Sequence, residues 1–190
     1  MIEKIRLWWK FDGQYMHKNF ICGVKNLIRW FPTIWKDRDW DQDFIYNLLA
    51  KKLKFQANYI EKRDWHVDAK RDAERIRLVA KLIAKHQADD YAMEYMDYAT
   101  TNFWFEDFID NPEYKEMKSK ITEERYDEFF AKYPRQYKRA LSGELNRYRR
   151  SETDTENKQT LAMEISHENQ KRCKRLLFTI MHDQIDCWWD

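Results

Sequence analysis

The sequence predicts an all-α protein of one compact domain, a helical bundle built on an antiparallel helix hairpin with a long C-terminal helix. Three observations support this fold class. The chain of 190 residues contains only three glycines and three prolines, and sheets and long ordered loops need both residue types at turns and bulges. Apolar residues recur every three or four positions in several long stretches, which is the spacing of amphipathic helices. The composition is 43% hydrophobic and 36% charged, and the two kinds of residue are interleaved, as on helices with one wet face.

Residues 14–87 are predicted to form the helical hairpin core. A first helix in this segment ends at Pro32, because a proline removes a helix hydrogen bond. Two further helices cover about 41–62 and 67–87, each with an apolar stripe at helical spacing. These two helices have similar lengths and a short connection, so we expect them to pack as an antiparallel pair.

The predicted domain continues through 88–150 and ends in a long helix over 153–190. The segment 88–150 starts acidic and aromatic, which we interpret as a broken helix, and then becomes basic and helical. Thr122 precedes two glutamates, a typical helix start, and Pro134 either ends that helix or opens the next one. Thr153 begins a capping-box pattern, and apolar residues follow it at helical spacing.

Charge is unevenly distributed along the chain. The net charge is +2 overall, but residues 86–128 carry −9 and residues 129–150 carry +6. Acidic and basic segments of this kind either pair across neighbouring helices, or the basic one forms a cleft whose positive potential gathers an anionic ligand. Both interpretations are open from the sequence alone.

Basic and aromatic residues alternate between 132 and 150, which is the strongest local pattern in the sequence. Basic side chains contact phosphates and aromatic rings stack on bases, so this alternation is typical of nucleotide or single-strand binding. The alternative is a solvated helix face that pairs with the acidic segment. Elsewhere, Arg71 and Arg75 are one helical turn apart and could grip one phosphate together. The candidate ligand-binding residues, for phosphate contact or base stacking, are Arg38, Trp40, Arg71, Arg75, Arg135, Tyr137, Lys138 and Arg139.

Two patterns resemble metal sites, but neither is complete. The aspartate run at 37–43 is similar to the start of a calcium loop, yet Gln42 stands where the loop needs glycine and Leu48 where it needs a bidentate glutamate. Glu164 and His167 have the ExxH spacing of di-iron bundles, which require a second such motif and two more glutamates. We therefore predict no metal site.

No catalytic residues are predicted either. His66 and His86 each lie near an aspartate in the sequence and could act as a general base. No nucleophile motif and no glycine-rich phosphate loop accompanies them. The three cysteines form no CxxC pair, which argues against a zinc ribbon or a disulfide framework. We expect no enzyme activity and no cofactor.

The apolar runs are too short for a membrane span of about 18 residues, and the first residues lack a signal-peptide pattern. We therefore expect a cytoplasmic protein without a membrane partner. Nine tryptophans lie mostly near the predicted helix ends. There they either plug the bundle or line a ligand pocket or an oligomer interface, where tryptophan and arginine dominate binding. We expect a homo-oligomer.

Several segments resemble small helical proteins encoded by bacteriophages. They are WKDRDWD at 35–41, FIYNLLAKKL at 44–53, HV at 66–67 before DAERIRL, DY at 90–91 and LLFTIMHDQIDCWWD at 176–190. The resemblance covers most of residues 28–190. It implies a viral accessory role in the cytoplasm of an infected bacterial cell, such as sequestering a host nucleotide signal that triggers antiviral defence.

The leading hypothesis from the sequence is an oligomeric binding protein that holds a small anionic, nucleotide-like ligand. The main alternative is a virion component or an inhibitor that docks on a host protein. A further alternative is a nucleic-acid-binding protein, which the basic segment favours and the near-zero net charge opposes.

Overall fold

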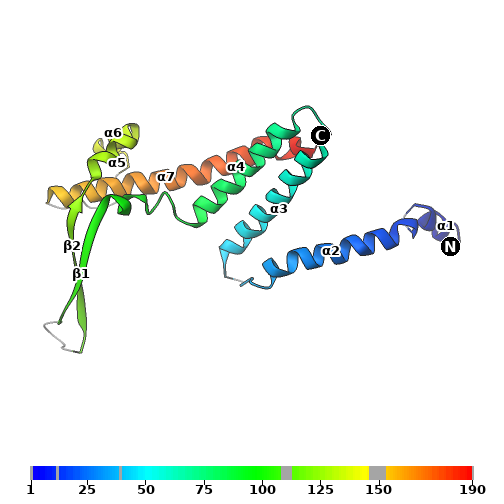
Figure 1. The fold of residues 1–190 in the computed structure, drawn as a ribbon, viewed down its shortest axis with the longest axis horizontal. Helices are drawn as coiled ribbons and strands as arrows, with labels where there is room; N and C mark the ends of the chain where they lie inside the picture. Colours follow the sequence, from blue (N-terminus) through cyan, green and yellow to red (C-terminus); the bar gives the residue numbers. More distant parts are fainter. Residues whose placement is uncertain (1, 12, 39, 108–112, 146–152, 190) are drawn as a thin grey trace. The chain divides into compact units, whose positions relative to one another are not determined.

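The computed structural model describes residues 2–11, 13–38, 40–107, 113–145 and 153–189. In these ranges the chain is 74% helical, with seven α-helices and one two-stranded sheet (Figure 1). The predominantly helical fold class is confirmed, but the protein is not purely all-α. The contacts within the chain group it into two units, 1–51 and 52–190. This grouping into two units does not test the prediction of a single domain, which stays a prediction.

The first unit contains α1 (Ile2–Phe11), a short 3₁₀ helix, α2 (Met16–Ile34) and the first part of α3 (Gln42–Arg63). Pro32 lies inside α2, so the prediction that it ends this helix is wrong. A proline close to the end of a helix removes a single hydrogen bond, and the Trp35 N–H still donates to the Phe31 carbonyl at 2.8 Å. The helix therefore continues past the proline.

The second unit begins with the remainder of α3. Its other helices and strands are α4 (Ala69–Gln87), β1 (Ala99–Asp107), β2 (Lys115–Glu124), α5 (Tyr126–Lys132), α6 (Pro134–Leu141) and α7 (Asp154–Gln184). Two 3₁₀ helices cover Glu94–Tyr98 and Ile185–Trp189. The bounds of α3 and α4 agree closely with the predicted helices. α4 packs along α7, and α5 and α6 also pack on α7 (Figure 1). The main packing partner of α4 among the described elements is α7. This packing does not test the predicted antiparallel pairing of α3 with α4, which stays a prediction.

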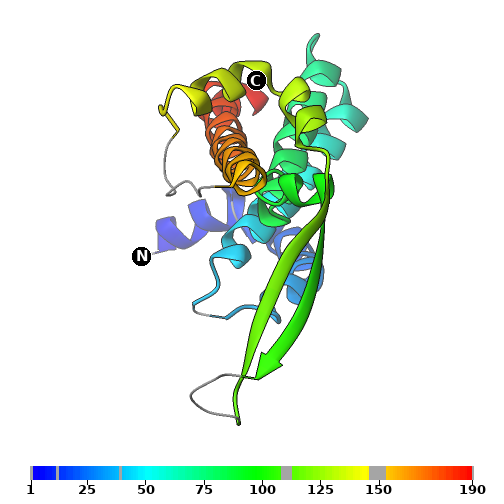
Figure 2. The same cartoon turned by 90° about the vertical axis from the view of Figure 1, so that its left-hand side faces the viewer.

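A β-hairpin replaces the broken helix that is predicted after residue 88. β1 pairs antiparallel with β2 in a register that runs from Ala99 opposite Glu124 to Asp107 opposite Lys115. The strand sequence ATTNFWFED is rich in β-branched and aromatic residues, which favour a pleated backbone. Scarce glycine and proline limit the number of turns, but a single hairpin needs only one. Figure 2 shows the two strands as a ribbon that extends away from the helices of this unit.

The helix predicted to begin at Thr122 begins later. Thr122 lies in β2, where its hydroxyl donates to the Thr100 carbonyl at 3.1 Å, and α5 begins at Tyr126. Pro134 is the first residue of α6, which confirms the second of the two roles predicted for it. A proline suits this position because the first N–H of a helix has no partner within the helix.

The long C-terminal helix predicted over 153–190 is confirmed over Asp154–Gln184, and a 3₁₀ helix follows it. Thr153 caps α7, because its hydroxyl oxygen accepts from the Glu156 N–H at 3.3 Å. The helix has 31 residues, a length of about 45 Å at 1.5 Å per residue. Its buried residues are of two kinds, apolar and polar, and they include Leu161, Ile165, Cys173, Leu177, Glu164, Asn169 and Gln170. α7 therefore contributes apolar side chains to the core and also buries several polar side chains.

Aromatic side chains of α5 form the centre of a core cluster in the second unit. The buried members on α5 and α7 include Tyr126, Phe129, Phe130, Leu161 and Ile165. The ring of Phe129 lies 5.2 Å from that of Tyr98 and 5.1 Å from that of Tyr133, in edge-to-face arrangements. This cluster fixes α5, and with it the start of α6, against α7.

Burial raises the pKa of two tyrosines, Tyr126 and Tyr133, from the ordinary value of 10.0 to about 12. For Tyr133, the hydrogen bond that its hydroxyl donates to Glu94 adds to the effect of burial. The folded-state pKa lies above the unfolded value, so the neutral phenols stabilise the fold below about pH 10. This contribution is lost as the pH rises through about 12.

A titration of the native protein followed by tyrosinate absorbance is therefore expected to show a late component near pH 12. Tyr126→Phe and Tyr133→Phe should each reduce this component, because each removes one of the shielded phenols. Complete tyrosine ionisation by about pH 11 would contradict the burial of these two side chains.

Candidate functional site

Four arginines gather where α6 meets α7. They line a pocket of about 350 Å³ together with Gln136 and Glu168, and they are Arg135 and Arg139 of α6 and Arg172 and Arg175 of α7. We call this the arginine pocket. The two arginines of α6 are four positions apart and those of α7 are three apart, so each pair lies on one face of its helix.

The arginine pocket keeps an excess of positive charge. Two carboxylates offset part of the charge of the four arginines. Glu168 lies 3.7 Å from the Arg139 guanidinium and 3.3 Å from that of Arg175. Glu144, which is not part of the lining, lies 2.9 Å from Arg139. Within the described part of the chain, Arg135 and Arg172 form no ion pair or hydrogen bond. Two guanidinium groups of the pocket therefore have all their donors available.

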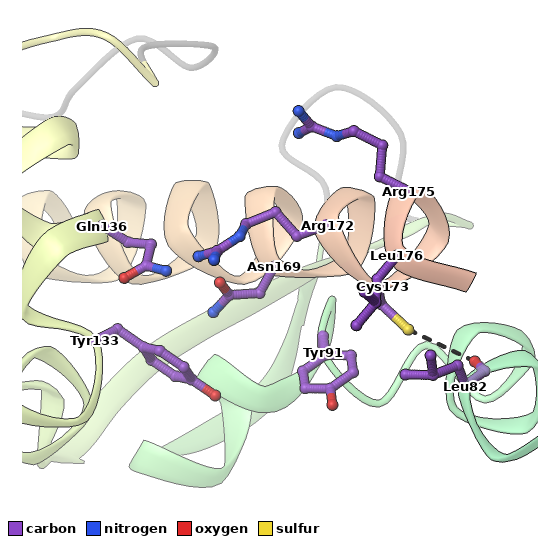
Figure 3. A pocket seen from close by; sticks show the side chains of 9 residues that line it. All are labelled: Leu82, Tyr91, Tyr133, Gln136, Asn169, Arg172, Cys173, Arg175 and Leu176. Atoms are coloured by element: carbon purple, nitrogen blue, oxygen red, sulfur yellow. Dashed lines mark hydrogen bonds between the residues drawn. The ribbon is translucent and has the colours of Figure 1, made fainter. Parts of the chain in front are cut away.

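A second pocket, of about 560 Å³, adjoins the first and shares Gln136, Arg172 and Arg175 with it. We call it the aromatic pocket; its other lining residues are Leu82, Tyr91, Tyr133, Asn169, Cys173 and Leu176. Figure 3 shows the polar ends of Gln136, Asn169 and Arg172 directed toward the same region, whereas Arg175 extends away. The rings of Tyr91 and Tyr133 lie below them in this view.

Contacts within the protein hold the sides of the aromatic pocket in place. The Tyr133 hydroxyl donates to a Glu94 carboxylate oxygen at 2.7 Å. The Lys85 ammonium lies 5.0 Å from the centre of the Tyr91 ring. The Cys173 thiol donates to a carbonyl of α4 at 3.6 Å, and burial raises the pKa of this thiol. These contacts fix the side chains of Tyr133, Tyr91 and Cys173 at the sides of the pocket.

Some charges of the acidic and basic segments pair with each other. Lys132 forms an ion pair with Glu94, which raises the pKa of the lysine. Lys158 lies 3.0 Å from Glu124 and 3.2 Å from Asp127. The pairing interpretation of the charge pattern is confirmed for Lys132 and Glu94, whereas Lys158 lies outside the basic segment 129–150.

Two of the predicted ligand-binding residues, Arg135 and Arg139, lie in the arginine pocket. Lys138 is exposed on the same helix and lines neither pocket. Tyr137 stacks its ring on that of Phe130, with the centres 4.2 Å apart and the planes inclined by 8°. One face of the Tyr137 ring is therefore used in packing rather than offered to a base.

The remaining predicted residues lie elsewhere. Arg71 and Arg75 line neither pocket, and each lies 3.7 Å from the same carboxylate oxygen of Asp72. A carboxylate of the protein therefore takes the place predicted for a phosphate. Arg38 and Trp40 belong to the first unit, where Trp40 is 83% exposed.

Ten of the twelve residues that line the two pockets were not predicted as site residues, among them Tyr91, Asn169, Arg172 and Arg175. The run KRCKR at 171–175 contains the two arginines, but basic residues beside an apolar stripe are typical of any solvated helix face. No spacing rule relates Tyr91 or Asn169 to α6, because their proximity arises only on folding.

Among the described residues, no group of three or more histidine, cysteine, aspartate or glutamate side chains is placed to hold a metal ion. None of the helices in the described ranges has the length and apolar character needed to cross a membrane. No protein-family model, no curated protein and no solved structure matches the chain. The case for a function therefore depends on the geometry of the two pockets.

Proposed function

We propose that this protein binds a small anionic ligand of the nucleotide type, whose phosphates lie in the arginine pocket. The observation that supports this proposal is the presence of four arginines and one glutamate in the lining of a single pocket. Arginine suits this task because its planar guanidinium group donates two parallel hydrogen bonds to a phosphate. Arg135 and Arg172 have no partner in the described part of the chain, so both are available to the ligand.

The two adjoining pockets favour a phosphorylated organic molecule over a simple anion. The excess of positive charge in the arginine pocket raises the local concentration of anions. The aromatic pocket offers tyrosine rings and apolar side chains, which suit a flat organic body. Because Gln136 and Arg172 line both pockets, one ligand of nucleotide size can occupy the two together.

The proposed role is sequestration of a host nucleotide signal by a phage-encoded accessory protein that forms a homo-oligomer. The resemblance to small phage proteins supports this role, and so does a site made of arginine, amide and aromatic side chains, since sequestration needs affinity and no chemical step. Native mass spectrometry of protein purified from infected cells tests the role, because it reports the oligomer mass and any retained small molecule together. A monomer without a retained molecule would contradict it.

Isothermal titration calorimetry tests the proposed ligand class directly. Pyrophosphate, nucleoside monophosphates and diphosphates, cyclic oligonucleotides and ADP-ribose form a suitable series. We expect binding heat with at least one phosphorylated compound, and an affinity that falls as the salt concentration rises. The absence of heat with every compound would overturn the proposal.

Cys173 offers a chemical measure of occupancy, because it lines the aromatic pocket while Cys22 and Cys187 are exposed. In a Cys22→Ser/Cys187→Ser variant, Cys173 should react slowly with a maleimide, since burial raises its pKa and only the thiolate reacts. A bound ligand should slow the reaction further, in proportion to the saturation measured by calorimetry. Equal rates with and without saturating ligand would show that the ligand does not enter this pocket.

A second candidate function, docking on a host protein, is favoured by the β-hairpin. Phe103, Phe105 and Met117 are 60%, 65% and 60% exposed on its two strands. Exposed apolar side chains that lie together mark interaction surfaces. The calorimetric series separates the two candidates, because a protein that binds none of the compounds favours docking on a host protein.

A further inference from the structure

We infer that the aromatic pocket holds a nucleobase and that the side-chain amide of Asn169 forms hydrogen bonds with the edge of this base. The inference rests on the proposed function, because it takes the arginine pocket as the phosphate site. It specifies the rest of the ligand as a nucleoside, which excludes inorganic polyphosphates and simple sugar phosphates. It also names the residue that determines the base preference.

Asn169 is a buried polar residue whose amide the protein leaves unpaired. The residue is 8% exposed, and its Nδ2 is buried without a hydrogen-bond partner in the described part of the chain. Buried polar groups are nearly always hydrogen-bonded, so this exception needs an explanation. Of the unpaired buried side-chain atoms among the described residues, this is the one that lines the arginine pocket or the aromatic pocket.

The neighbouring amide of Gln170 provides a contrast on the same helix. Its Nε2 donates to the Asp89 carboxylate at 2.9 Å and to the His86 carbonyl at 2.8 Å. Gln170 lines neither of the two pockets. The Gln170 Nε2 is therefore hydrogen-bonded, although its Oε1 is buried without a partner, whereas the Asn169 Nδ2 in the pocket lining has no partner among the described residues.

An amide requires a ligand group of a particular kind. Nδ2 donates and Oδ1 accepts, and the two atoms lie side by side. Phosphate oxygens at neutral pH accept, so a phosphate pairs with Arg172 but cannot satisfy both atoms of the amide. The edge of a nucleobase carries a donor next to an acceptor, and asparagine pairs with adenine in this bidentate way in protein–nucleic acid complexes.

The position of Asn169 places the base next to the phosphates. Asn169 and Arg172 are three residues apart on α7, so they lie on the same face of the helix. Figure 3 shows their polar ends directed toward the same region, together with the amide of Gln136 from α6. A phosphate bound to Arg172 therefore brings the remainder of the same ligand beside Asn169.

The other residues of the aromatic pocket suit a flat base. Tyr91 and Tyr133 line it together with Leu82 and Leu176. Aromatic rings stack favourably on every base, so the tyrosines provide affinity and the amide provides the preference. An inorganic polyphosphate would leave both the rings and the amide without a contact.

Calorimetry with pyrophosphate and four nucleoside diphosphates, ADP, GDP, CDP and UDP, tests the inference. The wild-type protein should bind at least one of the four about tenfold more tightly than pyrophosphate, and about tenfold more tightly than another base. Asn169→Leu keeps the volume and removes the hydrogen-bonding atoms. It should abolish the discrimination between bases and leave the affinity for pyrophosphate within about twofold.

Two further variants make the result interpretable. Asn102→Leu is the matched control, because Asn102 is exposed on β1 and lines neither pocket, so neither affinity should change. Tyr91→Leu removes a ring from the pocket without altering Asn169. It should lower the affinity for nucleoside diphosphates about fivefold or more and leave the affinity for pyrophosphate unchanged. This variant tests the inference even if Asn169→Leu does not fold.

The outcomes separate the inference from the proposed function. If the wild type binds pyrophosphate and all four nucleoside diphosphates equally, the inference is overturned and the proposed phosphate site stands. Unchanged base discrimination in Asn169→Leu likewise overturns the role of the amide. If the wild type binds none of the compounds, the proposed function fails and the inference fails with it.

Discussion

Replacing Phe129 with alanine is expected to lower the free energy of unfolding by about 3–5 kcal/mol, the usual range for a large aromatic side chain in a core. Phe129 is 0% exposed. The centre of its ring lies 5.2, 6.2 and 5.1 Å from the ring centres of Tyr98, Phe130 and Tyr133. Its removal leaves a cavity that these neighbours, which belong to different elements, fill only in part. Equilibrium unfolding in urea, followed by circular dichroism, measures the change.

Phe105→Ala is the matched control for this core substitution. Phe105 is 65% exposed on β1, so its loss should change the free energy of unfolding by less than about 1 kcal/mol. Equal losses in the two variants would contradict the central position of Phe129 in the core.

Removing the unpaired guanidinium groups of the arginine pocket is expected to have the largest effect on binding. Arg135→Ala and Arg172→Ala should each weaken the binding of a phosphorylated ligand by about 1.5–3 kcal/mol, the contribution of a hydrogen bond to a charged group. This corresponds to about 10-fold to 150-fold in the dissociation constant for each variant. Neither arginine has a partner in the described part of the chain, so the free energy of unfolding should stay within about 0.5 kcal/mol of the wild type.

Lys138→Ala is the control for general charge, because Lys138 is exposed on α6 and lines neither pocket. Its affinity should remain within about twofold of the wild type, since an exposed charge acts only through the screened field. Arg71→Ala and Arg75→Ala should also retain affinity, because both arginines lie beside Asp72 outside the pockets. If all these variants lose affinity equally, ligand binding depends on the net charge of the protein and not on the arginine pocket.

The helix bounds were predicted well where a long stretch of apolar residues at helical spacing starts or ends at a capping residue or a turn. α3 and α4 have such stretches, and the Thr153 cap begins α7 at the expected residue. The β-hairpin was missed because the argument from glycine and proline counts turns over the whole chain, whereas one pair of strands needs a single turn. Pro32 was misjudged because a proline near the end of a helix removes one hydrogen bond without ending the helix.

The site was predicted only where its residues are close in the sequence. Arg135 and Arg139 belong to one basic segment, which the charge pattern reveals. Arg172 and Arg175 lie in residues 151–190, whose net charge is −3. The net charge of this segment therefore gives no sign of a basic site. The aromatic pocket combines residues from α4, α6, α7 and the connections between them, and only tertiary packing brings these elements together.

α7 carries the buried residues Ile165 and Leu177 on the same helix as Asn169 and Arg172. If a ligand binds the two pockets as proposed, it binds the folded chain and raises the free energy of unfolding by an amount that grows with its free concentration relative to the dissociation constant. At a free concentration of about one hundred times the dissociation constant, this addition is about 2.7 kcal/mol. The melting temperature therefore reports occupancy, and a collection of metabolites can be ranked by affinity for this protein from melting curves alone.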